Sequence, residues 1–166
     1  MPEIIMTMSE QILLEKCRET ELLCKELYEY FAELYSSNRD AYCLWSKTAK
    51  EEENHAAQFT LALKLRKGMP CMVTVGPDKI ESINNQIRAV IAKVKVTPPK
   101  LADALSSSIK LERFLAEFHL SCVVVFEDES YKKMFNAMMA SDQEHIASLQ
   151  SAYDTLTGRQ DWSFTS

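Results

Sequence analysis

Hydrophobic residues recur every three or four positions along four long segments of the chain, separated by short polar stretches. This spacing is typical of amphipathic α-helices that bury one face. The pattern therefore predicts an all-α fold with four long helices. They run from about Ser9 to Tyr35, from Asp40 to Lys67, from just after Pro98-Pro99 to Phe126, and from the polar break Glu127–Ser130 to Thr157.

Residues that favour helix ends lie near these boundaries. Ser9 is the predicted N-cap of the first helix. Gly68 and Gly158 are predicted to end the second and fourth helices, because glycine readily adopts the conformation that follows a helix. The tail from Arg159 to Ser166 is then expected to be irregular.

A connection of about thirty residues, 68–99, separates the second and third helices and is far longer than the usual few. Isoleucines at helical spacing between Asp78 and Lys95 predict a short accessory helix inside it. Two short-looped helix pairs joined by one long crossover resemble the connectivity of ferritin-like bundles. We therefore expect one ferritin-like four-helix domain over residues 1–166, with its core at 9–157.

Composition and charge narrow the class of protein. Of 166 residues only 3 are glycine and 5 are proline, too few for the frequent turns of an all-β domain. The net charge of −5 and the lack of a basic stripe argue against a nucleic-acid partner. The start resembles no secretory signal, and no apolar run is long enough to span a membrane, so we expect a cytoplasmic protein without a membrane partner.

Cysteine usage agrees with this location. The chain has 5 cysteines, an odd number, and no two form a C-x-x-C pair. This pattern disfavours a disulfide framework, a zinc ribbon and a rubredoxin-type iron centre. We interpret the cysteines as buried free thiols in a reducing compartment.

The two halves of the chain resemble each other. Glu21 aligns with Glu112 at an offset of 91 residues. After one residue is dropped in the turn, Glu52 aligns with Asp142 at an offset of 90. The first and second helices therefore correspond to the third and fourth.

Each of the four apolar stripes carries one of these carboxylates near its middle, and His55 and His145 follow one turn after Glu52 and Asp142. Burying four carboxylates together is unfavourable unless cations neutralise them. Two divalent ions carry the required charge, and neutral imidazoles complete their coordination. Oxygen-rich sites with one imidazole per metal suit iron or manganese better than a structural zinc site.

One glutamate on each of two helices and Glu-x-x-His on each of the other two is the di-iron pattern of ferritin-like proteins. The stretches 21–32, 52–56, 112–119 and 141–146 resemble the rubrerythrin branch of that class in particular, and the resemblance covers all four predicted helices. It implies two iron ions, with manganese or zinc as other occupants. The ligands it implies are Glu21, Glu52, His55, Glu112, Asp142 and His145.

The resemblance also implies roles for single residues. Glu52, together with Glu112 or Glu21, is expected to bridge the metals, and Tyr28 matches a tyrosine that hydrogen-bonds a ligand carboxylate and takes part in catalysis. Two features depart from the family. Asp142 replaces a glutamate and is one methylene shorter, and the chain lacks a rubredoxin segment, so electrons would come from a separate donor protein.

Neighbouring polar residues have simpler interpretations. His119 lies two turns from Glu112, about 11 Å along the axis, and is read as a core histidine or a group behind the ligands. Glu51 and Glu53 are read as solvated charges on the outer face, and Glu144 is expected to point away from the site.

The resemblance implies an oxidoreductase that reduces hydrogen peroxide or dioxygen, and we expect a homodimer. Two alternatives remain open at this stage. The first is an iron-handling protein that oxidises iron for storage or transfer. The second is a ferritin-like scaffold whose metal site is degraded and which acts through protein contacts alone.

Overall fold

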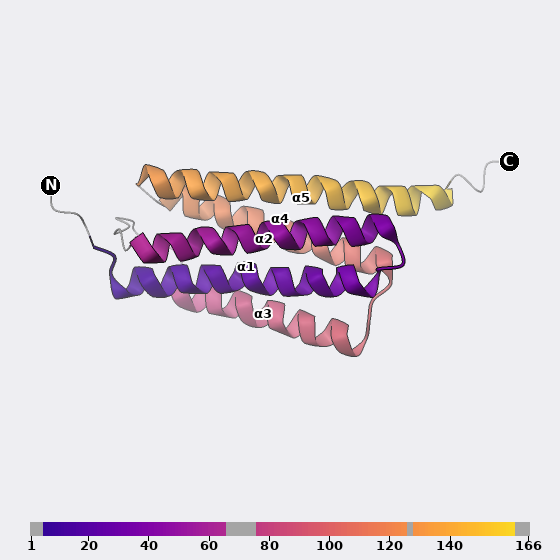
Figure 1. Ribbon diagram of the computed structural model, residues 1–166, viewed down its shortest axis with the longest axis horizontal. Helices are drawn as coiled ribbons and strands as arrows, with labels where there is room; N and C mark the ends of the chain where they lie inside the picture. The colour runs from indigo at the N-terminus through magenta and orange to yellow at the C-terminus, as the bar shows by residue number, and fades with distance from the viewer. Residues whose placement is uncertain (1–4, 66–75, 126–127, 162–166) are drawn as a thin grey trace.

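The computed structural model describes residues 5–65, 76–125 and 128–161, and within these ranges it contains five α-helices and no strand (Figure 1). The all-α prediction is therefore confirmed. The helices are α1 (Met8–Leu34), α2 (Arg39–Leu65), α3 (Pro77–Val96), α4 (Leu101–Val125) and α5 (Glu129–Asp161).

The long helices pack in two pairs, α1 with α2 and α4 with α5, and α2 also contacts α5 (Figure 1). Helix α3 lies along α1 on the side away from α5. It belongs to the connection between the two pairs, where the accessory helix was predicted, although at 20 residues it is not short. This packing is consistent with a helical bundle.

The start of α1 differs from the prediction. Thr7, not Ser9, is the N-cap: its hydroxyl accepts a hydrogen bond from the backbone N–H of Glu10 at 3.2 Å. The Glu10 carboxylate accepts one in return from the backbone N–H of Thr7 at 2.7 Å. The reciprocal capping box explains the shift, because Ser9 has the apolar Ile12 three residues later and cannot form one.

The starts of α2 and α5 agree with the predicted boundaries more closely than the end of α5 does. The Asn38 side chain accepts from the backbone N–H of Ala41 at the start of α2, and Asp128 does the same for Ser130 at the start of α5. Gly68 lies outside the described residues. Gly158 does not end α5, which continues to Asp161, because glycine is tolerated in a helix at a cost of about 1 kcal/mol.

The apolar stripes face one another and form the core. Trp45, Phe31 and Phe135 are fully buried, and the Trp45 ring packs at 5.2 Å from that of Phe31. The Trp45 indole N–H donates to the Ser108 hydroxyl at 3.3 Å, which links α2 to α4. Four isoleucines of α3 are buried as well: Ile80, Ile83, Ile87 and Ile91.

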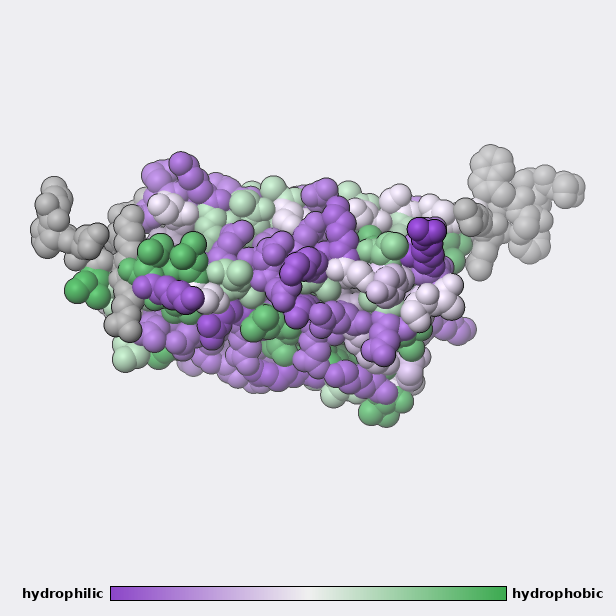
Figure 2. Space-filling model, in the orientation of Figure 1, coloured by the Kyte–Doolittle hydropathy of each residue, from purple (hydrophilic) through white to green (hydrophobic). Residues whose placement is uncertain are grey.

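The outer surface is mostly hydrophilic on the face shown in Figure 2, with a hydrophobic patch toward the end where α1 begins and α2 ends. Most apolar side chains are therefore buried, as the periodicity predicts. Within the described ranges, no helix has a stretch long and apolar enough to cross a bilayer.

Candidate metal centre

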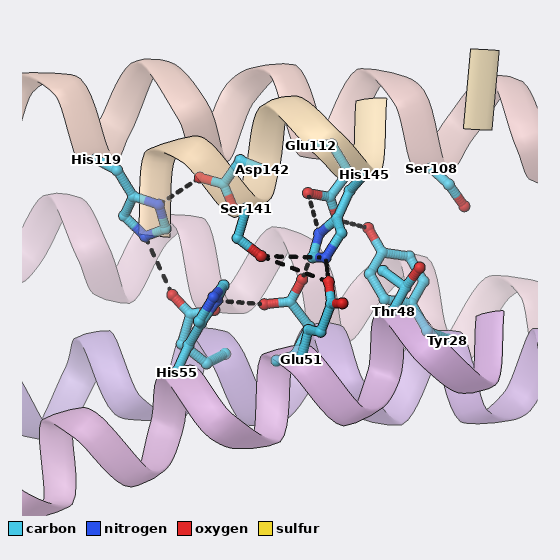
Figure 3. A network of polar contacts seen from close by, with 12 residues as sticks. Tyr28, Thr48, Glu51, His55, Ser108, Glu112, His119, Ser141, Asp142 and His145 are labelled. Carbon is cyan, nitrogen blue, oxygen red and sulfur yellow. Dashed lines mark hydrogen bonds and ion pairs between the residues drawn. The ribbon is translucent and has the colours of Figure 1, made fainter. Parts of the chain in front are cut away.

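The six predicted ligands all lie in the interior of the bundle, and none is more than 5% exposed. Helix α1 contributes one carboxylate, α2 a carboxylate and a histidine, α4 a carboxylate, and α5 a carboxylate and a histidine (Figure 3). The side chains extend toward one another because each occupies the middle of its helix's apolar stripe. The inward orientation predicted for these residues is therefore what the structure shows.

Three of them form a first triad, Glu21, Glu52 and His55. The Nδ1 atom of His55 lies 3.2 Å from Glu52 Oε2 and 3.4 Å from Glu21 Oε2. One ligand atom from each residue falls within 4.8 Å of the others, a spacing that a single metal ion can span.

A second triad, Glu52, Glu112 and His145, has the same composition. The Nδ1 atom of His145 lies 3.2 Å from Glu112 Oε2 and 3.3 Å from Glu52 Oε1. Glu52 thus belongs to both triads and turns a different oxygen toward each histidine. A carboxylate in that position can join two metal ions.

Asp142 is buried beside these triads but belongs to neither. Its Oδ2 atom lies 2.5 Å from Nδ1 of His119, and its Oδ1 atom has no hydrogen-bond partner among the described residues. The Nε2 atom of His119 lies 3.1 Å from Glu21 Oε1. His119 is therefore a core histidine that links two of the predicted ligands, in agreement with one of its sequence-based interpretations.

Tyr28 is fully buried, and its hydroxyl donates a hydrogen bond to Oε1 of Glu112 (Figure 3). This is the type of contact that the resemblance implied for it. The bond leaves Oε2 of Glu112 facing His145.

Glu51 lies closer to the site than its sequence position predicts. It was predicted to be a solvated outer charge, but its side chain is only 25% exposed and it contacts the Nε2 atom of His145 (Figure 3). On a helical wheel Glu51 lies one residue away from the buried stripe. The wheel could not show that α5 packs close enough for His145 to reach it. Glu53, by contrast, lies outside and pairs with Lys50, and the side chain of Glu144 is 67% exposed, as expected.

The charges in this interior compensate one another. Burial alone would lower the pKa of the histidines, but contacts with carboxylates raise the pKa of His55 and His119 to about 10 and that of His145 to about 11. Burial raises the pKa of Glu112 to about 7 and also raises that of Glu52. In the protein without metal, protonated imidazoles would therefore balance the neighbouring carboxylates.

The carboxylate of Glu21 behaves differently from its neighbours. Burial raises its pKa, but contacts with His119 and His55 outweigh this effect and bring the pKa well below the ordinary value. Glu21 is therefore ionised, as a metal ligand must be.

The residues fit a pair of divalent cations. Within the part of the chain that the structure describes, three buried carboxylate oxygens lack a hydrogen-bond partner: Glu21 Oε2, Glu52 Oε1 and Asp142 Oδ1. The first two face the imidazole nitrogens of the two triads. A donor set rich in oxygen with one imidazole per ion suits iron or manganese.

No family model matches the chain, and neither a curated protein nor a solved structure matches it.

Proposed function

We propose that this chain is a ferritin-like di-iron protein that reduces hydrogen peroxide or dioxygen to water. One observation carries the proposal, the pair of buried Glu/His triads that share Glu52. The ferritin-like assignment is supported by two packed helix pairs, α1–α2 and α4–α5, with the long connection between them. The sequence correspondence of the two halves supports it further.

The protein's own residues would have distinct roles. Glu21, Glu52 and His55 would hold one ion, and Glu112, Glu52 and His145 the other. Asp142 remains a proposed sixth ligand. A di-iron pair supplies two electrons at one place, which suits the cleavage of an O–O bond.

The surroundings of the ligands support this chemistry. Their burial excludes bulk water, so the charges of the site interact strongly. Tyr28 holds Glu112 through its hydroxyl and is the nearest candidate to orient that ligand during turnover.

Reduction of one peroxide molecule consumes two electrons and two protons and yields two water molecules. Reduction of one dioxygen molecule to two water molecules consumes four electrons and four protons, so the donor would have to reduce the centre twice. The sequence has no C-x-x-C pair that would hold a rubredoxin-type iron. A separate electron-donor protein would therefore supply the electrons. We expect the working form to be a homodimer.

Stopped-flow mixing of the anaerobic, iron-loaded and reduced protein with hydrogen peroxide tests the proposal. We expect fast oxidation, with one peroxide consumed per two irons. A Glu52→Gln variant should lose this reaction, because it alters the carboxylate shared by both triads. A Glu53→Gln variant is the matched control, since Glu53 lies one residue away on the outer surface and pairs with Lys50.

The two alternatives make different predictions in the same experiment. Continued mineral growth when excess ferrous iron and oxidant are added would favour iron storage over peroxide reduction. A protein that binds no iron after supplementation would favour the scaffold and contradict the proposal.

A further inference from the structure

The histidines of the two triads have similar contacts at Nδ1 but different contacts at Nε2. Both His55 and His145 turn Nδ1 toward two carboxylates. The Nε2 atom of His145 contacts Glu51 Oε2, whereas the described part of the chain places no carboxylate against Nε2 of His55. The two candidate metal positions are therefore not equivalent.

Glu51 is held in place from several sides. Its Oε1 atom lies 3.7 Å from the ammonium of Lys47, one helical turn away. The Ser141 hydroxyl lies 3.5 Å from Oε2 of Glu51 and 3.4 Å from Nε2 of His145 (Figure 3). The contact between Glu51 and His145 thus joins α2 to α5 at the edge of the buried site.

A carboxylate next to Nε2 favours one tautomer of the neutral imidazole, the one with its proton on Nε2. When Nε2 carries the proton and donates a hydrogen bond to Glu51, the lone pair of the neutral ring lies on Nδ1. That atom faces Glu52 and Glu112. Carboxylates behind a metal-bound histidine fix its orientation and raise its basicity.

We propose that Glu51 is the positioning residue of His145 and that it makes the Glu52–Glu112–His145 position the tighter of the two metal positions. The inference rests on the metal centre of the proposed function but not on its redox activity. Glu51 acts through His145, because the two ring nitrogens point to different sides and Glu51 belongs to neither triad.

Zinc titration of the metal-free protein in competition with a chromophoric chelator tests this inference. We expect the wild-type protein to bind two ions per chain. Glu51→Gln should weaken one of the two binding steps by about 10- to 100-fold and leave the other nearly unchanged. Glu53→Gln removes a neighbouring carboxylate outside the site and should behave like the wild-type protein.

A spectroscopic signature separates positioning from a merely structural role. In ¹⁵N-histidine NMR spectra of the zinc-loaded wild-type protein, we expect His145 to carry its proton on Nε2, with a downfield proton shift caused by the carboxylate. In Glu51→Gln this proton should move upfield, while the signals of His55 stay in place. Circular dichroism checks that the variant keeps its helical content.

Four results would overturn the inference. Two ions bound with unchanged affinities in Glu51→Gln would overturn it and leave the proposed function intact. Complete loss of one ion at every zinc concentration, or a His145 ring that binds zinc through Nε2, would show that the proposed geometry is wrong. A wild-type protein that binds no zinc at the triads would overturn both this inference and the metal centre itself.

Discussion

At the scale of single residues, Glu52 has the most constrained position. It is fully buried, and its two oxygens face two different histidines from α2 and α5. Without a cation or a protonated imidazole on each side, such a carboxylate would be strongly destabilising. Its position is therefore best explained by a site that binds positive charge on both sides.

The contact between Tyr28 and Glu112 leads to a prediction about stability. Tyr28→Phe removes the only tyrosine hydroxyl that hydrogen-bonds Glu112 among the described residues and leaves a buried oxygen without its donor. We expect the free energy of unfolding of the metal-free protein to fall by about 1–3 kcal/mol. Urea unfolding followed by circular dichroism measures it. An unchanged free energy would mean that the hydroxyl does not stabilise Glu112.

Helical periodicity was enough to predict that the six proposed ligands face inward. It placed Glu21, Glu112 and His145 inside because each occupies an apolar stripe, and all three are buried. Contacts between helices could not be predicted in this way. A wheel gives the direction of a side chain but not its height relative to a neighbouring helix, so the contacts of Glu51 with His145 and of His119 with Asp142 were not foreseen.

At the scale of the elements, the centres of the helices were predictable and their ends less so. Apolar spacing extends over many residues, whereas an end depends on a few competing local contacts. The N-cap of α1 is the residue that can form a capping box, and this residue is Thr7 and not Ser9. Similarly, Gly158 favours a helix end, but the remainder of α5 continues past it to Asp161.

The helical environment of Gly158 makes it a site for stabilisation. A Cβ atom added there would meet no other atom within 4 Å, so alanine fits without a clash. We expect Gly158→Ala to raise the free energy of unfolding by up to about 1 kcal/mol, because alanine loses less backbone entropy in a helix. Thermal unfolding monitored at 222 nm checks the change.

The matched control is Gly76→Ala. Gly76 also has open space around it, but it is the N-cap of α3, where alanine is a poorer residue than glycine. This variant should gain no stability. Equal effects of the two substitutions would contradict the assignment of Gly158 to the helix.

At the scale of the whole molecule, three buried histidines and at least four buried carboxylates make stability depend on pH. Each histidine has a pKa raised above the ordinary 6.5, to about 10 or 11. Their contribution to stability is complete below pH 6.5 and is lost as the pH rises through those values. Burial raises the pKa of Glu112 from 4.5 to about 7. This shift also makes the folded protein less stable as the pH rises.

We therefore expect the melting temperature of the metal-free protein to fall as the pH rises from about 6 to about 10. Metal ions replace the bound protons, so the metal-loaded protein should lose less stability over this range, and metal affinity should rise with pH. Differential scanning calorimetry with and without a chelator tests both expectations. Identical pH profiles for the two forms would show that the metal does not replace these protons.

The central claim, that the bundle holds two metal ions in its interior, is tested most directly by anomalous X-ray diffraction from iron-loaded crystals at the iron absorption edge. The account predicts two anomalous peaks on either side of Glu52, one among Glu21, Glu52 and His55 and the other among Glu52, Glu112 and His145. A map without anomalous density between these side chains, in crystals grown from protein saturated with iron, would contradict it.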